Sequence, residues 1–122
     1  MTVRQVSKQC GISVDTIRYY ERVGLITVDK GSYYKNYDQQ TVDTLLAIKR
    51  LRLAELSIEE IKRLLSIDLE PAELSQKQLD SISAVIDNAI DRAKIRAKEI
   101  DESQRLLERM KNKLIAVRNE DN

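Results

Sequence analysis

The sequence has 122 residues, of which 42% are apolar and 34% are charged, with a formal net charge of +1. This composition is that of an ordinary folded domain, and because no 18-residue apolar stretch could cross a membrane, we expect a cytoplasmic protein. The sequence contains one cysteine, Cys10, and no histidine, which excludes internal disulfides, Cys/His metal centres and histidine-dependent catalysis, so we expect no enzyme, metal site or cofactor.

The first 24 residues have the pattern of two short helices joined by a turn. Thr2 and Gln5 have the spacing of a capping box, which predicts a first helix over residues 3–9. Gly11 favours a turn, and Ser13 is a good N-cap for a second helix that ends near Gly24. This arrangement is typical of a helix-turn-helix, whose second helix commonly enters the major groove of DNA.

The second helix is expected to present a polar and aromatic surface. Its apolar positions would lie inward, at Val14, Ile17 and Tyr20. Thr16, Arg18 and Tyr19 then lie on the outward faces. Residues 1–53 contain all five tyrosines and nine Lys or Arg against five Asp or Glu, whereas the remainder contains twelve against fifteen. The basic, aromatic end of the chain therefore favours contact with a polyanion. The simpler alternative for the adjacent Tyr19 and Tyr20 is that one lies in the core and the other at a solvent-exposed edge.

Residues 25–37 have the pattern of a β-hairpin. Residues 25–28 are rich in β-branched side chains, residues 29–32 have turn chemistry, and residues 33–37 can pair back as a second strand. A hairpin that follows a recognition helix is a wing. Lys30 near its tip and Lys35 beside the tyrosines would then contact phosphate and sugar, which positions a protein on DNA without reading bases.

Three segments of the chain together resemble the MerR family of winged-helix transcription regulators. They are IRYYERVGL at residues 17–25, YKNY at residues 34–37, and the segment from Ile48 to Ile61, so that the matches extend across residues 1–66. The resemblance implies a homodimer on a twofold-symmetric operator in double-stranded promoter DNA. It also implies that the protein acts by distorting that DNA between the two elements that RNA polymerase binds.

The resemblance also implies which residues contact DNA. Arg18 and Tyr19 match the recognition-helix residues that touch DNA, and Lys35 stands where the family usually has a wing arginine. Arg52 matches a base that the family places against the DNA backbone, and Lys49 lies three residues earlier on the same helix face, although both also fit a solvated stripe. The candidate DNA-contact residues are therefore Thr16, Arg18, Tyr19, Lys30, Tyr34, Lys35, Tyr37, Lys49 and Arg52.

Two further helices are expected after the hairpin. Asp38 would cap a helix over residues 39–53. The core side chains of that helix are expected to be Val42, Leu45, Leu46, Ile48, Leu51 and Leu53. Ser57 and Glu60 form a second capping box, which starts a helix that runs to about residue 65. Between the two helices Glu55 replaces a glycine that the family usually has, so we expect that turn to be made differently.

The last third of the chain has the apolar spacing of a coiled coil. Ser75 and Gln78 have capping-box spacing, and apolar residues then recur at steps of three and four, with interruptions at Arg96 and Ser103. The expected dimerisation residues are Leu79, Ile82, Ile86, Ala89, Ala93, Ile100, Leu107, Met110 and Leu114. A helix of about 60 Å needs a partner along its length. The resemblance implies that the partner is a second copy, in an antiparallel coiled coil.

The expected fold is thus mainly α. A winged helix-turn-helix domain with a small β-wing covers residues 1–67, and a connector covers residues 68–76. The dimerisation helix covers residues 77–117, and a short tail covers residues 118–122.

The sequence leaves open what the protein would sense. Metal-sensing members of the family have cysteines at the start of the long helix and just after it, whereas this chain has Ser75 there and no thiol in residues 118–122. Three alternatives remain: a small organic ligand between the coiled coil and the DNA-binding domain, thiol chemistry at Cys10, or no ligand. The alternative function is a coiled-coil protein-interaction module whose winged helix binds a protein partner, because fold alone does not fix function.

Overall fold

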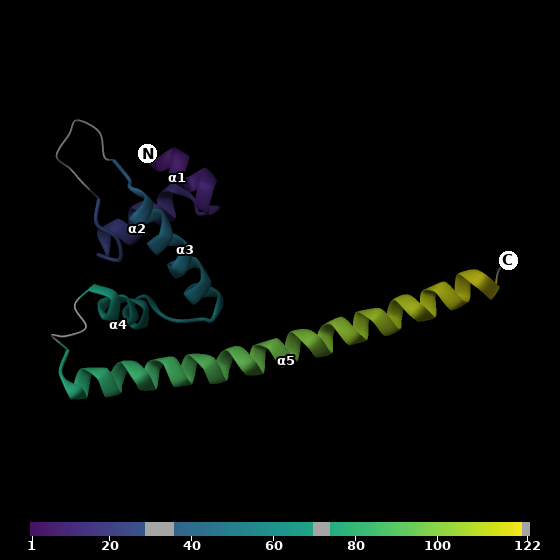
Figure 1. Ribbon diagram of the computed structural model, residues 1–122. Helices are drawn as coiled ribbons and strands as arrows, with labels where there is room; N and C mark the ends of the chain where they lie inside the picture. Colours follow the sequence, from purple (N-terminus) through teal and green to yellow (C-terminus); the bar gives the residue numbers. More distant parts are fainter. Residues whose placement is uncertain (29–35, 70–73, 121–122) are drawn as a thin grey trace. The chain divides into compact units, whose positions relative to one another are not determined.

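The computed structural model describes residues 1–28, 36–69 and 74–120, with the backbone alone for residues 67–69. The described residues form five helices, α1 (Val3–Cys10), α2 (Val14–Arg22), α3 (Gln39–Leu53), α4 (Ile58–Leu69) and α5 (Gln76–Glu120) (Figure 1). The chain divides into two compact units, Met1–Ile86 and Asp87–Asn122. The first unit contains the helix-turn-helix, and the second is the outer part of α5.

Helix α1 begins where its sequence predicts and ends one residue after the predicted end. The Thr2 N–H donates to Gln5 Oε1 at 2.8 Å and the Gln5 N–H donates to Thr2 Oγ1 at 3.2 Å, which confirms the capping box. Gly11, at φ +68°, ends the helix one residue later than expected, and its N–H donates to the Ser7 carbonyl at 2.9 Å. The side chain of Val6 is fully buried, because α1 packs against both α2 and α3.

Helix α2 also follows the prediction. The Ser13 hydroxyl accepts from the Thr16 N–H at 3.2 Å, as an N-cap does. Ile17 and Tyr20 are buried, so the inward face is the one that the apolar spacing predicts. The helix ends at Arg22, and Gly24 follows in the left-handed region at φ +84°, which a glycine adopts without strain.

The described residues contain no β-wing, and the prediction of a strand over residues 25–28 is wrong. Leu25, Ile26 and Val28 are all buried. Two adjacent buried side chains do not fit the alternation of a strand with one wet face. On the other side of the expected hairpin, Asn36 is a single β-bridge residue, and the Tyr37 N–H donates to the Met1 carbonyl at 2.9 Å. The expected tip and most of the second strand, residues 29–35, lie outside the described residues.

Helix α3 has the predicted bounds, and Asp38 is its N-cap. One carboxylate oxygen of Asp38 accepts from both the N–H and the hydroxyl of Thr41, each at 2.8 Å. Val42, Leu45 and Ile48 are fully buried, as expected. Leu53 is 69% exposed, so its assignment to the core is wrong. It lies five residues after Ile48, and at about 100° per residue this spacing turns it well away from the buried face.

The turn between α3 and α4 differs from the expectation for Glu55. Glu55 has φ +64°, the left-handed conformation that glycine favours. Its N–H donates to the Arg52 carbonyl at 3.0 Å, and the Leu56 N–H donates to the Leu51 carbonyl at 3.3 Å. These two bonds form a Schellman motif with Glu55 in the position that glycine usually occupies. The turn is therefore made as a glycine would make it, and the prediction of a different turn is wrong.

Both of the later capping boxes are present. At α4 the Ser57 N–H donates to Glu60 Oε1 at 2.9 Å, and the Glu60 N–H donates to the Ser57 hydroxyl at 3.1 Å. At α5 the Ser75 N–H donates to Gln78 Oε1 at 2.8 Å, and the Gln78 N–H donates to the Ser75 hydroxyl at 3.2 Å. Helix α4 runs to Leu69, beyond the expected end at residue 65. Ser75 therefore has the structural role that its spacing predicts.

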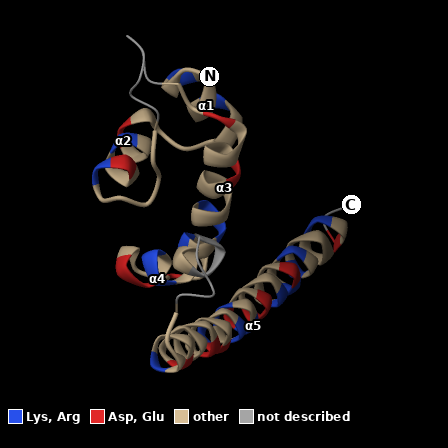
Figure 2. Ribbon diagram, turned by 60° about the vertical axis from the view of Figure 1, so that its left-hand side comes forward, with Lys and Arg blue, Asp and Glu red and all other residues tan. Residues whose placement is uncertain are grey.

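Helix α5 is 45 residues long and carries an apolar stripe that the single chain leaves exposed. Among the expected dimerisation residues, Ile82 and Ala89 are buried within the chain. The large apolar side chains further along remain 58–68% exposed, at Ile100, Leu107, Met110 and Leu114. Lys and Arg are interspersed with Asp and Glu along the length of α5 (Figure 2). The outer part of α5 is thus an amphipathic helix whose apolar side has no partner within the described chain.

Candidate nucleic-acid interface

The outward face of α2 combines two cations and an aromatic ring. Tyr19 is 41% exposed, and the guanidinium carbon of Arg22 lies 5.6 Å from the centre of its ring, in cation–π contact. Arg18, one turn before Arg22, is exposed and makes no hydrogen bond or ion pair with the described residues. Its guanidinium presents its N–H donors in the planar fork that fits a guanine edge or a phosphate.

Tyr19 is held from two sides. The Tyr20 ring, which belongs to the core, has its centre 6.1 Å from that of Tyr19 and is tilted by 48°. The guanidinium of Arg22 makes the second contact with the Tyr19 ring, so this ring has one buried neighbour and one exposed neighbour. Sequence reasoning placed Tyr19 outward but did not identify the role of Arg22. The signal was available, since residues three apart are neighbours on a helix surface.

Thr16 lies at the N-terminal end of the same helix and is half-buried. Its Oγ1 accepts a hydrogen bond from the Ser13 hydroxyl at 2.8 Å. The Thr16 hydroxyl proton remains available as a donor to a phosphate or base oxygen. Thr16, Arg18 and Tyr19 thus lie on one short helix whose first turn is fixed by its cap.

The basic side chains of α3 that we expected to contact DNA both make hydrogen bonds within the chain. Lys49 Nζ donates to the Cys10 carbonyl at 3.0 Å, and Arg52 Nη1 donates to the Leu56 carbonyl at 2.7 Å. Cys10 is the last residue of α1, and Leu56 lies in the turn between α3 and α4. The guanidinium of Arg52 retains further N–H groups, whereas the single ammonium of Lys49 lies directly against the turn after α1.

Among the expected wing residues, Tyr37 is the one that the structure describes. The ring of Tyr37 is buried, with 2% of the residue exposed, so it packs in the core and does not present a surface for DNA. The Met1 ammonium donates to Tyr37 O at 3.0 Å and to Asn36 Oδ1 at 2.7 Å, which fixes the backbone there. Lys30, Tyr34 and Lys35 lie outside the described residues.

Cys10 has the environment of a packing residue. It is 3% exposed, and its sulfur lies 4.0 Å from the Val42 carbonyl oxygen. Burial raises the pKa of the Cys10 thiol, and the positive charge of Lys49 opposes this effect only in part. A thiol with a raised pKa and little exposure contains little thiolate at neutral pH, so this environment does not favour sensing chemistry.

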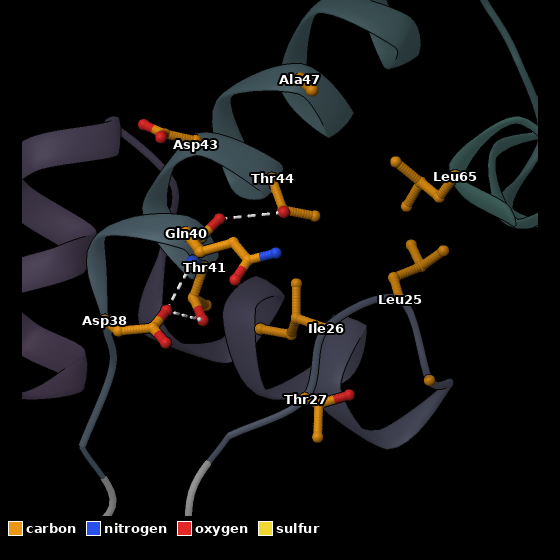
Figure 3. Close-up of a pocket in the computed structure, with 11 residues that line it drawn as sticks. Leu25, Ile26, Thr27, Asp38, Gln40, Thr41, Asp43, Thr44, Ala47 and Leu65 are labelled. Carbon is orange, nitrogen blue, oxygen red and sulfur yellow. Dashed lines mark hydrogen bonds between the residues drawn. The ribbon is translucent and has the colours of Figure 1, made fainter. Parts of the chain in front are cut away.

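A groove of about 580 Å³ lies between the loop after α2, the first half of α3 and Leu65 of α4. Figure 3 shows Leu25 and Leu65 pointing into one end of it and Asp38 at the other. Hydrogen bonds from Thr41 lower the pKa of Asp38, and these bonds are those of the α3 cap. Asp38 and Asp43 both line the groove, and the Asp38 carboxylate is engaged in the α3 cap.

The described residues contain neither of two other kinds of site. No three His, Cys, Asp or Glu side chains lie close enough together there to hold a metal ion. None of the described helices is both long enough and apolar enough to pass through a bilayer.

The sequence is similar to known regulatory proteins. Residues 1–67 match the family described as MerR HTH family regulatory protein. The chain is 42% identical over 69 residues to the mercuric resistance operon regulatory protein of Bacillus cereus, covering 53% of this chain and 51% of that one. It is 33% identical over 111 residues to the HTH-type transcriptional regulator HmrR of Rhizobium leguminosarum bv. viciae, covering 90% and 83%. Against the first of these relatives, the chain spans about half of the relative's length.

The fold is similar to that of a regulator crystallised on DNA. HiNmlR, a MerR family regulator that lacks the sensor domain, was solved bound to promoter DNA. It superposes with a TM-score of 0.67 over 84% of this chain and 76% of its own, at 19% sequence identity. At that identity the likeness establishes a shared fold.

Proposed function

The chain belongs to the MerR family of helix-turn-helix transcription regulators, which are not enzymes, and from this premise we propose that it binds promoter DNA as a homodimer and regulates transcription there. The observation that carries the proposal is the outward face of α2. Arg18 makes no bond with the described residues and Tyr19 is half exposed, on a helix whose opposite face is buried. A helix that presents an exposed guanidinium is suited to reading base edges in a major groove.

The roles of the α2 side chains follow from their chemistry. Arg18 would donate two parallel hydrogen bonds to a guanine or a phosphate, and Tyr19 would pack on the sugar–phosphate backbone or on a thymine methyl group. Arg22 holds the Tyr19 ring and adds positive charge on the same face. In this proposal Thr16 donates its hydroxyl proton to the backbone. Lys30, Tyr34 and Lys35 would extend the contact as wing residues.

The dimer is proposed from the apolar stripe on α5. Ile100, Leu107 and Leu114 recur every seven residues, and Met110 lies between them at the spacing of a second seam position. All four are mostly exposed in the single chain. A second α5 packed along this stripe would remove these side chains from water, and in an antiparallel arrangement it would present two recognition helices to one face of the DNA.

The further steps rest on family membership. The dimer would distort the promoter between the two polymerase-binding elements and would act with RNA polymerase, in the cytoplasm where bacterial promoters lie. HiNmlR, which shares this fold, was crystallised on promoter DNA without a sensor domain. We identify no effector; the organic-ligand alternative and the alternative without a ligand both fit this proposal.

The test is a selection of duplexes from a random-sequence pool by the purified full-length protein. We expect enrichment of an inverted repeat, and binding to the enriched duplex that weakens steeply as salt rises. For six to ten phosphate contacts the affinity should fall about 10³- to 10⁵-fold between 50 and 200 mM salt. If no sequence is enriched and no DNA is bound at low salt, the regulator proposal is wrong, and the protein-interaction alternative becomes the better account.

A further inference from the structure

Lys49 on α3 connects two parts of the helix-turn-helix that are distant in the sequence. It follows Val42 and Leu45 on the face of α3 that packs toward α1. Its ammonium donates to the carbonyl of Cys10, the last residue of α1, at 3.0 Å. The last four carbonyls of a helix have no partner within the helix, and a cation there also interacts favourably with the helix dipole. Lys49 therefore provides a C-terminal cap for α1 from another helix.

Gly11 lies beside this ammonium and carries no side chain that would meet it. A Cβ atom built on Gly11 would lie 2.9 Å from Lys49 Nζ, so that the end of this flexible side chain would have to shift if residue 11 carried a side chain. Gly11 therefore serves two purposes, since it takes the left-handed conformation that ends α1 and leaves room for the Lys49 side chain.

The turn is otherwise closed by short-range bonds. The Ser7 hydroxyl donates to the Ile12 carbonyl at 2.6 Å, and the Gly11 N–H donates to the Ser7 carbonyl. The Cys10 carbonyl is the one that receives its bond from α3. Helix α2 begins at Val14, immediately after this turn. The direction in which α2 leaves the turn is therefore linked to α3 through Lys49.

Building on the proposed function, we propose that Lys49 is a positioning residue for the recognition helix, which acts by holding the α1–α2 turn against α3 and not by neutralising a DNA phosphate. If the ammonium moved to a phosphate, the Cys10 carbonyl would lose its donor at a part-buried position, which carries a cost in free energy. Lys49 acts on DNA only through the orientation of α2, which carries Arg18 and Tyr19.

The first experiment compares Lys49→Met with wild type on the selected duplex and on a scrambled duplex, at several salt concentrations. Methionine keeps the unbranched stem and removes the charge and the donors. We expect affinity for the selected duplex to fall about tenfold, with little change on the scrambled duplex and with the salt dependence unchanged. Arg50→Met, which removes an exposed cation from the same helix, is the matched control, and Lys49→Arg should regain most of the loss.

A phosphate contact would give a different result. The slope of log affinity against log salt would then become shallower by about 0.9 for each lysine removed, and both duplexes would be bound more weakly. That result, or wild-type affinity in Lys49→Met, overturns the proposal while leaving the proposed function intact. If wild type itself enriches no duplex, the proposed function fails and this role of Lys49 fails with it.

The contact itself is tested without DNA by a double-mutant cycle. The free energy of unfolding in urea is measured for Gly11→Ala, Lys49→Met and the double variant. The strain of alanine at positive φ is present in both backgrounds and cancels, so the coupling reports the contact. We expect Gly11→Ala to be less destabilising when Lys49 is already Met. Additive effects would show that Gly11 and Lys49 do not interact and would overturn the inferred contact.

Discussion

Glu55 is expected to be a residue where glycine stabilises the protein. It has φ +64° in the Schellman turn that ends α3. The left-handed conformation costs a residue with a Cβ atom about 1–2 kcal/mol, whereas glycine adopts it freely. Glycine also gives the unfolded chain more conformational entropy, which costs about 0.4–1 kcal/mol. With the middle of each range, the net preference for glycine over alanine at this position is about 0.8 kcal/mol.

The assay compares Glu55→Gly with Glu55→Ala by urea unfolding at one protein concentration. Both variants remove the same side-chain interactions, so their difference isolates the backbone term. Glu59, in the first turn of α4, is the matched control site, because its conformation is right-handed and alanine should there be more stable than glycine by about 1 kcal/mol. The sign of the glycine–alanine difference should thus reverse between the two positions. If alanine were as stable as glycine at position 55, the strain inferred for this turn would be absent.

Two further predictions concern the α3 cap and the α5 stripe. Hydrogen bonds from Thr41 lower the pKa of Asp38, so this carboxylate contributes stability that is present above the unfolded pKa of about 4 and lost as pH falls below it. Asp38→Asn should therefore reduce the dependence of the free energy of unfolding on pH in that window, as measured by unfolding from pH 7 to pH 2. An unchanged dependence would contradict the assignment of Asp38 as the cap. Leu107→Glu should convert the dimer to monomer in analytical ultracentrifugation, whereas Asn112→Glu, on the opposite side of the heptad, should not; a dimer that tolerates a charge at residue 107 would exclude the stripe as its interface.

Local hydrogen-bond chemistry made the helix starts predictable from the sequence. Thr2, Ser13, Asp38, Ser57 and Ser75 were each assigned as caps, and each accepts the expected backbone N–H. A cap depends on residues within one turn of helix, so its signal is contained in a few neighbouring positions.

The features that sequence reasoning missed depend on distant partners or on strain. Tyr37 was assigned to the DNA surface, but its backbone pairs with Met1, and its ring is buried. Lys49 bonds to Cys10, 39 positions away, and no local pattern indicates that pairing. Glu55 adopts a conformation that its own preferences disfavour, because the bonds of the surrounding turn impose it.

Part of the candidate interface likewise follows from local sequence, and part depends on contacts between distant residues. The exposure of Arg18 and Tyr19 follows from the helical spacing of Val14, Ile17 and Tyr20, which α2 needs for its buried face. Whether a basic side chain on α3 is available to DNA depends instead on what lies beside it in space. That information is present only in the folded chain.

The most direct test of the account is the effect of Arg18→Ala on binding to the selected and scrambled duplexes, with Arg63→Ala, which removes an exposed cation from α4, as the control. A bidentate base contact predicts a loss of about 1–3 kcal/mol on the selected duplex, little change on the scrambled one, and near wild-type behaviour of the control. An equal loss on both duplexes would make Arg18 a phosphate contact. Unchanged binding to the selected duplex would contradict the assignment of α2 as the recognition helix.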